Sequence, residues 1–419
     1  MKLTIVGGGS TYTPEIVAGL VRLRDALDVT ELALHDVAAE RLDVLAGVSR
    51  RMLRAGGHPA AVTTHTDLAA AADGAGIVLV QLRVGGQDAR LSDETIPLSC
   101  DCLGQETTGA GGLAKALRTV PVMLDVVEGV RKVNPDAWII DFTNPVGIVT
   151  RALLRAGHDR VAGLCSAAAV FQRHFARILD VDPARIALDH VGLNHLTWER
   201  RVWLDGEDVL PRLLAEHAHR VAPATGLPAG LVRRLGTVPS YYLHYYYAHD
   251  EVVARQQEHG VRAQEVMAIE AELLRQYADE SVTAKPELLT RRGGAHYSDA
   301  ALDLMNSLLS GDGRTHVLNV RNGSTLPFLP VDAVVEVPAA VTADAVAPLP
   351  VDPVEPLVAG LIAHVTAYED LALDAAVHGG RDRVFKALLA HPLIGQYAVA
   401  DELTDLLLAA NRDHLAWLR

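Results

Sequence analysis

Cysteine and long hydrophobic runs are both scarce in this sequence. The three cysteines, Cys100, Cys102 and Cys165, are an odd number, so they exclude a framework of paired disulfides and favour a reducing compartment. No apolar run reaches the ~20 residues that a membrane-spanning helix needs. The N-terminus has no cationic stretch, long apolar core or cleavage site of a secretion signal. We therefore expect a globular protein of the cytoplasm.

Positive charge is also in short supply. The chain has 38 lysines and arginines against 52 aspartates and glutamates, a formal net charge of -14 at pH 7. Because this charge repels a phosphate backbone, we expect no nucleic-acid partner, although a local basic patch can still bind one small phosphate. At 419 residues the chain is too long for one small core, and two domains are expected.

The first part of the chain alternates apolar runs with amphipathic stretches. Strands are expected at residues 3–6, 31–35, 62–65, 77–82, 138–142 and 160–164, and helices at residues 14–27, 38–55 and 117–133. This alternation predicts an α/β fold, a Rossmann-type doubly wound parallel sheet with right-handed crossovers, over residues 1–165. Ligands of such sheets bind at the carboxyl ends of the strands.

After residue 165 the pattern changes. Residues 186–191 and 199–204 alternate like strands, and Asp205-Gly206 is a hairpin turn signal. Helices are expected at 262–277, 298–309, 357–376 and 381–390, with strands at 315–320 and 334–337. We assign residues 166–419 to a second, α+β domain.

A glycine loop follows the first expected strand and opens a helix. Gly7 and Gly9 fit the first two positions of a dinucleotide fingerprint, while Tyr12 replaces the third glycine. Asp36 ends the second strand, where a carboxylate accepts hydrogen bonds from an adenosine ribose and favours NAD over NADP. The alternatives are a tight turn without ligand and, for the aspartate, a helix cap. The expected cofactor-binding residues are Gly7, Gly8, Gly9, Ser10, Thr11 and Asp36.

Further polar loops fall on the same edge of the expected sheet. Asn144 stands in an Asn-Pro turn like those of lactate and malate dehydrogenases, where an amide binds substrate or nicotinamide ribose or simply caps a helix. Residues 104–112 are dense in glycine and hydroxyls, which indicates a loop that wraps a ligand or only turns. Arg83 and Arg90 flank a glycine pair, so at least one guanidinium is expected to face the cleft.

Cys165 and His195 are a candidate pair of a different kind. Their spacing fits no local zinc finger, and taken singly they are a core cysteine and a loop histidine. As a pair, thiolate and imidazole suit a borderline divalent ion with positions left for substrate oxygens. Five tyrosines lie within residues 241–247, as core and interface aromatics or with one of them as a base.

Ordered blocks along nearly the whole chain resemble one family. They are IVGGGSTYTPE (5–15), RVGG (83–86), DE-IPL (93–98), GQETTGAGG (104–112), FTNPVG (142–147), GLC (163–165), GLNH (192–195), YLHYYY (242–247), KPELLTRRGGAHYSDAA (285–301) and NVRNGS (319–324). They are similar to those of glycoside hydrolase family 4, the NAD- and divalent-metal-dependent glycosidases, and within it to the 6-phospho-β-glucosidases. The resemblance implies hydrolysis through oxidation at sugar C3, deprotonation at C2, elimination of the aglycone and addition of water.

The resemblance also implies roles for single residues. Tyr242 would remove the C2 proton, and Glu106 would be the carboxylate that raises its basicity. Cys165 and His195 would bind Mn²⁺ or another divalent metal. The residues expected to contact substrate are Arg90, Asn144 and Arg262. The second domain would then carry substrate and metal binding and assemble a homodimer or homotetramer.

The sequence departs from the family pattern at a few positions. Ser166 follows the cysteine where asparagine or an acidic residue is common, and Ala168 replaces a usual proline. Thr95 stands where several relatives carry a basic residue. Three alternatives therefore stay open: the same mechanism on sugars without phosphate, an NAD-dependent 2-hydroxy-acid dehydrogenase, and a non-catalytic NAD-binding sensor.

Overall fold

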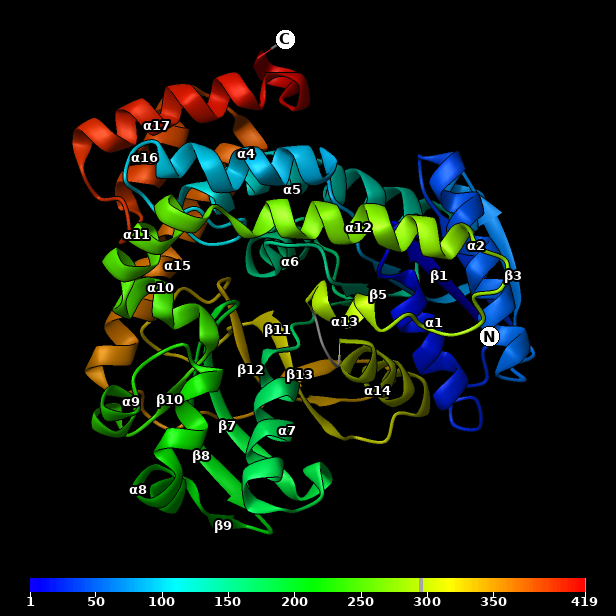
Figure 1. Ribbon diagram of the computed structural model, residues 1–419, viewed down its shortest axis with the longest axis horizontal. Helices are drawn as coiled ribbons and strands as arrows, with labels where there is room; N and C mark the ends of the chain where they lie inside the picture. Colours follow the sequence, from blue (N-terminus) through cyan, green and yellow to red (C-terminus); the bar gives the residue numbers. More distant parts are fainter. Residues whose placement is uncertain (294–296, 419) are drawn as a thin grey trace.

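The apolar runs of the first part form one large sheet in the computed structural model, which describes residues 1–293 and 297–418 (Figure 1). Its order is β13-β12-β11-β6-β5-β4-β1-β2-β3. The strands are β1 (Lys2–Val6), β2 (Glu31–His35), β3 (Ala61–His65), β4 (Ala75–Val80), β5 (Trp138–Asp141), β6 (Val161–Gly163), β11 (Thr315–Arg321), β12 (Val334–Val341) and β13 (Val346–Pro348). Residues 294–296 of the block at 285–301 lie outside the described residues.

Strands β1 to β6 are parallel, and their order confirms the expected Rossmann-type α/β fold. The central strands β4 and β5 are mostly apolar and buried, as expected where helices cover both faces of a sheet, whereas the edge strand β3 is partly exposed. The helices of this part are α1 (Thr13–Arg22), α2 (Ala39–Ala55), α3 (Leu68–Ala72), α4 (Gly86–Leu98), α5 (Gly109–Val133), α6 (Val146–Arg155) and α7 (Ala167–Leu179).

The strand order reverses direction between β1 and β4, because β1 pairs in parallel with β2 on one side and with β4 on the other. A parallel sheet leaves a crevice at such a switch point, outside the carboxyl ends of its strands. Gly7 follows β1, Asp36 follows β2 and Cys165 lies just beyond β6. The topology therefore places the predicted polar loops along one edge.

A smaller antiparallel sheet lies beside the large one. It consists of β7 (Ile186–Leu193), β8 (Leu196–Leu204), β9 (Glu207–Asp208) and β10 (Val238–Pro239). Asn194 and His195 form the tight turn between β7 and β8, and Asp205-Gly206 makes the predicted hairpin turn with φ of 50° and 90°. β10 pairs with β8 and leads directly into the tyrosine cluster, so one hairpin organises both segments.

The remaining helices pack around the two sheets. They are α8 (Leu210–Val221), α9 (Ala229–Leu235), α10 (His244–Tyr247), α11 (His249–His259), α12 (Arg262–Ala278), α13 (Leu288–Arg291), α14 (Tyr297–Ser310), α15 (Pro356–His378), α16 (Arg381–Ala390) and α17 (Tyr397–Ala410). Figure 1 shows α12 running across the molecule, where it packs against α2 and α4. Within the described residues, no helix has the length and apolar character to cross a membrane.

The domain boundary predicted at residue 165 stays a prediction. β11 pairs antiparallel with β6 and is followed by β12 and β13, so the large sheet contains strands from both sides of that boundary. Helix α15 from the C-terminal part likewise packs on α5. The C-terminal part therefore completes the first sheet as well as forming the second.

Candidate active site

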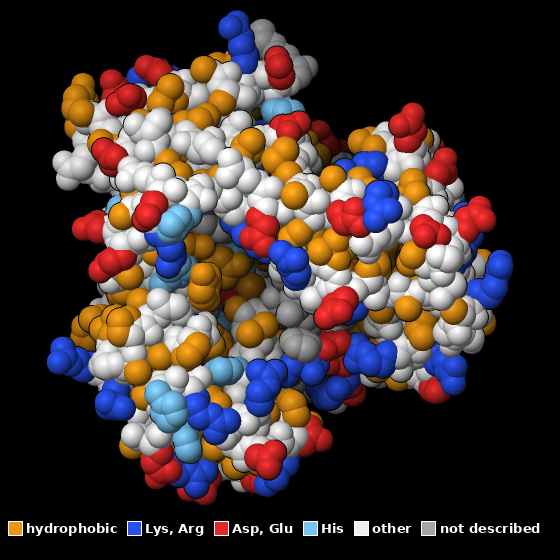
Figure 2. Space-filling view, viewed as in Figure 1, with side chains coloured by type: hydrophobic (Ala, Val, Ile, Leu, Met, Phe, Trp, Pro, Cys, Tyr) orange, Lys and Arg blue, Asp and Glu red, His pale blue; other side chains and the backbone are white. Residues whose placement is uncertain are grey.

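One cavity of about 900 Å³ lies where the two sheets meet. Figure 2 shows the molecule hollowed near its centre, between the lobe that carries α8 and β8 and the layer that carries α12. The predicted site residues that line it are Gly7, Gly9, Ser10, Asp36, Arg90, Glu106, Asn144, Cys165, His195, Tyr242 and Arg262. Gly8 and Thr11 are not among the described residues that line this cavity, and both are buried in the loop behind it.

The glycine loop at one end of the cavity is shaped by its backbone. Gly7 has φ of 87°, and a Cβ there would lie 2.7 Å from the Gln81 carbonyl oxygen. A Cβ on Gly9 would lie 2.7 Å from Asp36 Oδ2, which accepts the Gly9 N–H at 2.9 Å. The bare backbone at the start of α1 thus leaves a cradle for a pyrophosphate. The Asp36 carboxylate keeps further acceptor sites for ribose hydroxyls, so these residues fit NAD.

Glu270 of helix α12 supports this loop through Arg41. The Glu270 carboxylate accepts hydrogen bonds from Arg41 and Gln87, each at 2.9 Å. Arg41 Nε in turn donates to the Gly9 carbonyl oxygen at 3.1 Å. These residues could not be predicted from the sequence, because they are far apart in the chain and belong to no recognisable motif.

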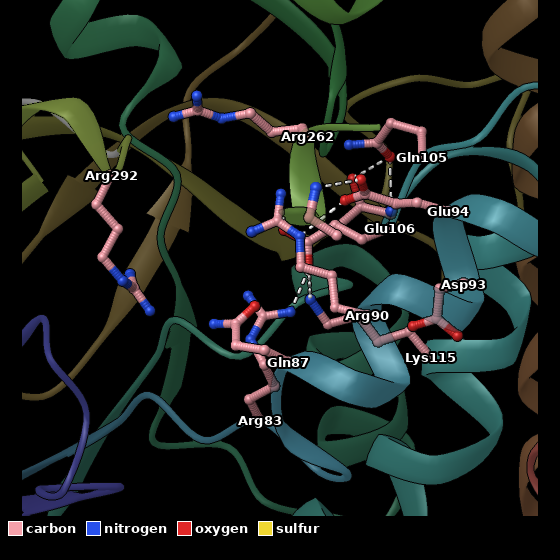
Figure 3. A network of polar contacts seen from close by, with 12 residues as sticks. Arg83, Gln87, Arg90, Asp93, Glu94, Gln105, Glu106, Lys115, Arg262 and Arg292 are labelled. Carbon is pink, nitrogen blue, oxygen red and sulfur yellow. Dashed lines mark hydrogen bonds and ion pairs between the residues drawn. The ribbon is translucent and has the colours of Figure 1, made fainter. Parts of the chain in front are cut away.

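Glu106 is surrounded by cations (Figure 3). Arg83 and Lys115 Nζ bind the same carboxylate oxygen, the lysine at 2.6 Å, and Arg90 approaches the other oxygen at 3.4 Å. Burial alone would raise the pKa of Glu106, but the three cations hold it well below its usual value. The carboxylate is therefore ionised, and it acts on its surroundings as a negative charge rather than as a proton acceptor.

Positive charge exceeds negative charge in the cavity, although the chain as a whole is acidic. Among the described lining residues, six carry a guanidinium or ammonium group and three carry a carboxylate. The cations are Arg41, Arg83, Arg90, Lys115, Arg262 and Arg292. In Figure 3, Arg262 and Arg292 lie across the cavity from the Glu106 cluster. A concave site with this balance attracts anionic ligands.

His195 is presented in one defined tautomer. It occupies the β7–β8 turn with φ of 62°, and its Nδ1 lies 2.8 Å from Thr107 Oγ1. The Thr107 hydroxyl donates its proton to Gln105 Oε1 at 2.9 Å, so it accepts from His195 Nδ1–H. Burial lowers the pKa of His195 to about 4, which keeps the ring neutral. The Nε2 lone pair is then free for a metal ion, the arrangement that a second hydrogen bond enforces in metal-binding histidines.

Cys165 lies at the end of β6, where α7 begins. The pKa of Cys165 is lowered, and the thiolate favoured, by the backbone N–H groups of Ser166 and Ala167 and by the side chain of Asn194. Burial outweighs them and raises the pKa of Cys165, so a thiolate there requires a cation. Among the described residues, no group of three or more His, Cys, Asp or Glu gathers as a metal site. The thiol and imidazole fit a divalent ion that takes its other ligands from substrate.

Tyr242 stacks directly on His195, with ring centroids 3.6 Å apart and an interplanar angle of 8°. Burial, followed by the nearby Cys165, raises the pKa of Tyr242 well above its usual value. A phenol in this environment releases its proton only if positive charge is bound beside it. Tyr241 and Tyr245 also line the cavity, whereas Tyr246 and Tyr247 are not among its described lining residues.

Asn144 and Arg262 both line the cavity. Asn144 Oδ1 is buried and has no hydrogen-bond partner among the described residues, although the residue lines the cavity. An orphaned buried acceptor of this kind suits a ligand hydroxyl. Arg262 begins α12, half-exposed, and pairs with Glu265. Thr95 lies on the exposed face of α4, where its hydroxyl donates to the Leu91 carbonyl oxygen at 2.8 Å.

Comparison with known proteins finds relatives that match along the chain. The model of the family 4 glycosyl hydrolases matches residues 2–181, and that of their C-terminal domain matches residues 190–394. The 6-phospho-β-glucosidase of Escherichia coli (strain K12) is 35% identical over 437 residues, covering 100% of this chain and 96% of the relative. A 6-phospho-α-glucosidase from gut microorganisms, solved with NAD and glucose-6-phosphate, is 26% identical with a TM-score of 0.92 over the full length of both chains.

The 6-phospho-β-glucosidase of Thermotoga maritima is similar in structure as well. Its structure with NAD and glucose-6-phosphate is 32% identical, covers 99% of each chain and has a TM-score of 0.93. A second structure of that protein contains manganese, NAD⁺ and glucose-6-phosphate, with a TM-score of 0.91 and 31% identity.

Proposed function

This chain belongs to family 4 of the glycosyl hydrolases, and we propose that it hydrolyses 6-phospho-β-glucosides with NAD and a divalent metal. One observation carries the proposal. A single cavity joins the glycine loop and Asp36 to Cys165, His195 and Tyr242. A 2-hydroxy-acid dehydrogenase or a sensor does not need the second group of residues, whereas a glycosidase of this family needs both.

The excess of cations in the cavity supports a phosphorylated sugar. NAD itself carries a pyrophosphate, and the six lining cations provide for a second anion beside it. The threonine at position 95 does not weaken this proposal, because its side chain is on the exposed face of α4. The E. coli and T. maritima relatives named for β-glucosides, 35% and 32% identical, favour the β-linkage over the α-linkage of the relative at 26%.

The residues of the chain divide the chemistry between them. When bound, NAD⁺ supplies a reversible hydride acceptor and the metal supplies Lewis-acid polarisation of the sugar oxygens. Cys165 and His195 hold the metal, and Tyr242, stacked on the same imidazole, takes the proton from C2. Asn144 Oδ1 accepts a hydrogen bond from a sugar hydroxyl. The charge of Glu106 keeps the phenolate basic, and Arg90 and Arg262 contact the substrate.

Hydrolysis of nitrophenyl glycosides tests the proposal directly. We expect nitrophenol release from 4-nitrophenyl 6-phospho-β-glucoside only when NAD⁺ and Mn²⁺ are both present, with no net formation of NADH. Equal release from the glucoside without phosphate would establish the same mechanism on unmodified sugars. NADH formed in step with product would instead show a dehydrogenase, and preference for the α-anomer would overturn the β-assignment.

The cellular setting is part of the same proposal. Free Cys100, Cys102 and Cys165 support a reducing cytoplasm. The substrate is a small phosphoglycoside, and we infer a homodimer or homotetramer that binds neither nucleic acid nor membrane. Gel filtration with light scattering tests the oligomer.

A further inference from the structure

The two proposed metal ligands belong to different sheets. Cys165 lies just beyond β6 of the nine-stranded sheet, and His195 occupies the β7–β8 turn of the smaller sheet. A metal ion requires its ligand atoms within a few tenths of an ångström of their ideal separation. Neither sheet can set that separation alone, so the contacts that join the two sheets decide it.

Glu336 is the centre of those contacts. It lies on β12 of the large sheet with an exposed fraction of 1%. Its Oε2 accepts from Asn194 Nδ2 at 3.0 Å and from Asn319 Nδ2 at 2.8 Å, and its Oε1 lies 3.1 Å from His190 Nε2. One carboxylate thus binds the neighbouring strand β11 on one side and the β7–β8 hairpin at two points on the other.

His190 extends this connection into the stem of the hairpin. It pairs across the strands with Glu199, and its Nδ1 lies 2.7 Å from Glu199 Oε1. Burial would lower the pKa of His190, but Glu199 and Glu336 raise it to about 10. The ring is therefore an imidazolium that donates to both carboxylates, and such charge-assisted hydrogen bonds are short, strong and directional.

Two of the residues that bind Glu336, Asn194 and Asn319, also connect it to the region of Cys165. Asn194, which donates to Glu336, also lowers the pKa of Cys165 through its side chain and so favours the thiolate. Asn319 pairs with Gly163, so β11 adjoins the last residue of β6, two residues before the cysteine. Glu336 consequently contacts a residue adjacent to His195 and a residue that flanks the strand leading to Cys165.

We propose that Glu336 is a positioning residue that aligns Cys165 with His195 and orients the Asn194 amide on the thiolate. This inference rests on the metal role in the proposed function. It goes beyond that role, because it assigns the affinity of the site to a carboxylate that is not a ligand. Outer partners of metal ligands typically contribute 10–100-fold to metal affinity.

Measured affinities for Mn²⁺ and NAD⁺ distinguish positioning from general support of the fold. We expect Glu336→Gln, which keeps the shape but loses the charge, to bind Mn²⁺ about 10–100-fold more weakly by electron paramagnetic resonance titration. NAD⁺ affinity should stay within about twofold, because the glycine loop lies at the other end of the cavity. Glu336→Asp keeps the charge and should recover part of the loss.

Asp93→Asn is the matched control. Asp93 is also a buried carboxylate, 1% exposed, and holds Arg118 by two hydrogen bonds of 2.8 and 2.6 Å between α4 and α5. The Asp93→Asn substitution should lower thermal stability and leave Mn²⁺ affinity unchanged. If Glu336→Gln fails to fold, Asn194→Ala removes only the connecting amide and should weaken Mn²⁺ binding about tenfold.

The outcomes separate this inference from the proposed function. Wild-type Mn²⁺ affinity in both Glu336→Gln and Asn194→Ala, or an equal loss in Asp93→Asn, overturns the positioning role alone. A wild-type chain that hydrolyses nothing with NAD⁺ and binds no Mn²⁺ overturns the proposed function and this inference together. Loss of Mn²⁺ affinity in Glu336→Gln with NAD⁺ binding intact supports both.

Discussion

The two ends of the cavity are built in different ways. The cofactor end is a short stretch of backbone, in which Gly7, Gly9 and Asp36 meet at the ends of two adjacent strands. The metal end brings together side chains from two sheets, with Tyr242 stacked on His195 and Cys165 lining the same cavity. The groups that face the cofactor are close together in sequence, although Arg41 and Glu270 support them from elsewhere, whereas the metal end exists only in the folded chain.

This difference predicts how each end responds to substitution. At the cofactor end, a new side chain obstructs a cradle and affects NAD⁺ binding while the metal end persists. At the metal end, several buried polar groups share partners, so the effects of single substitutions there are expected to be strongly non-additive when the substitutions are combined. The experiments below test whether the two ends fail independently.

The largest effect is expected from Tyr242→Phe. It keeps the ring that stacks on His195 and removes the oxygen, so folding and the binding of NAD⁺ and Mn²⁺ should survive. Turnover should fall by roughly 10²–10⁴-fold, as is typical when an acid–base group is lost. Exchange of the substrate C2 proton with deuterated solvent, followed by nuclear magnetic resonance, should fall with it.

Tyr246→Phe is the control for that substitution, because Tyr246 is not among the described residues that line the cavity. It should leave turnover and exchange unchanged. If Tyr242→Phe keeps both while Tyr245→Phe abolishes them, the base is Tyr245, which also lines the cavity.

Loss of a proposed metal ligand comes next. Cys165→Ser and His195→Ala should each weaken Mn²⁺ binding by more than the ~10–100-fold expected of an outer partner, and most activity should be lost. NAD⁺ affinity, measured by calorimetry, should remain, because neither residue contacts the glycine loop in the described hydrogen bonds. Wild-type activity of either variant in metal-free buffer would show that the pair binds no catalytic metal.

The sequence predicted the cofactor end from the residues themselves. A strand, three glycines, a helix and an acid after the next strand are contiguous signals, and the structure has them as expected. The doubly wound sheet followed from the same alternation of apolar runs. Helix α4 was missed because it begins at a glycine and has a proline near its end, and α17 because little polar periodicity marks it.

The metal end could be anticipated only through family resemblance. Spacing did not distinguish Cys165 and His195 from a core thiol and a loop imidazole, since only the fold brings the two residues to one cavity. Glu336 and His190 carried no signal at all, because buried ion pairs between distant strands follow no local pattern. Lys115 was missed for the same reason: its partner Glu106 comes from the preceding loop, and only the fold buries the pair.

The smallest effect is expected at the cofactor end, from Gly9→Ala. The new methyl group would lie 2.7 Å from Asp36 Oδ2, so the carboxylate must turn away from the Gly9 N–H that now holds it at 2.9 Å. NAD⁺ affinity should fall roughly tenfold, near the lower end for a hydrogen bond to a charged group. Mn²⁺ affinity should not change, because the metal end has its own supports.

Asp36→Asn separates charge from shape in that prediction. It keeps the size of the side chain and removes the negative charge that repels a 2′-phosphate, so the ratio of NAD⁺ to NADP⁺ affinity should fall toward one. Gly9→Ala displaces the carboxylate without neutralising it. It should therefore lower the NAD⁺ affinity more than it changes the ratio of NAD⁺ to NADP⁺ affinity. If Gly9→Ala binds NAD⁺ like the wild type, Asp36 does not contact the ribose. If it also weakens Mn²⁺ binding, the two ends are coupled, and the independence that their construction suggests is wrong.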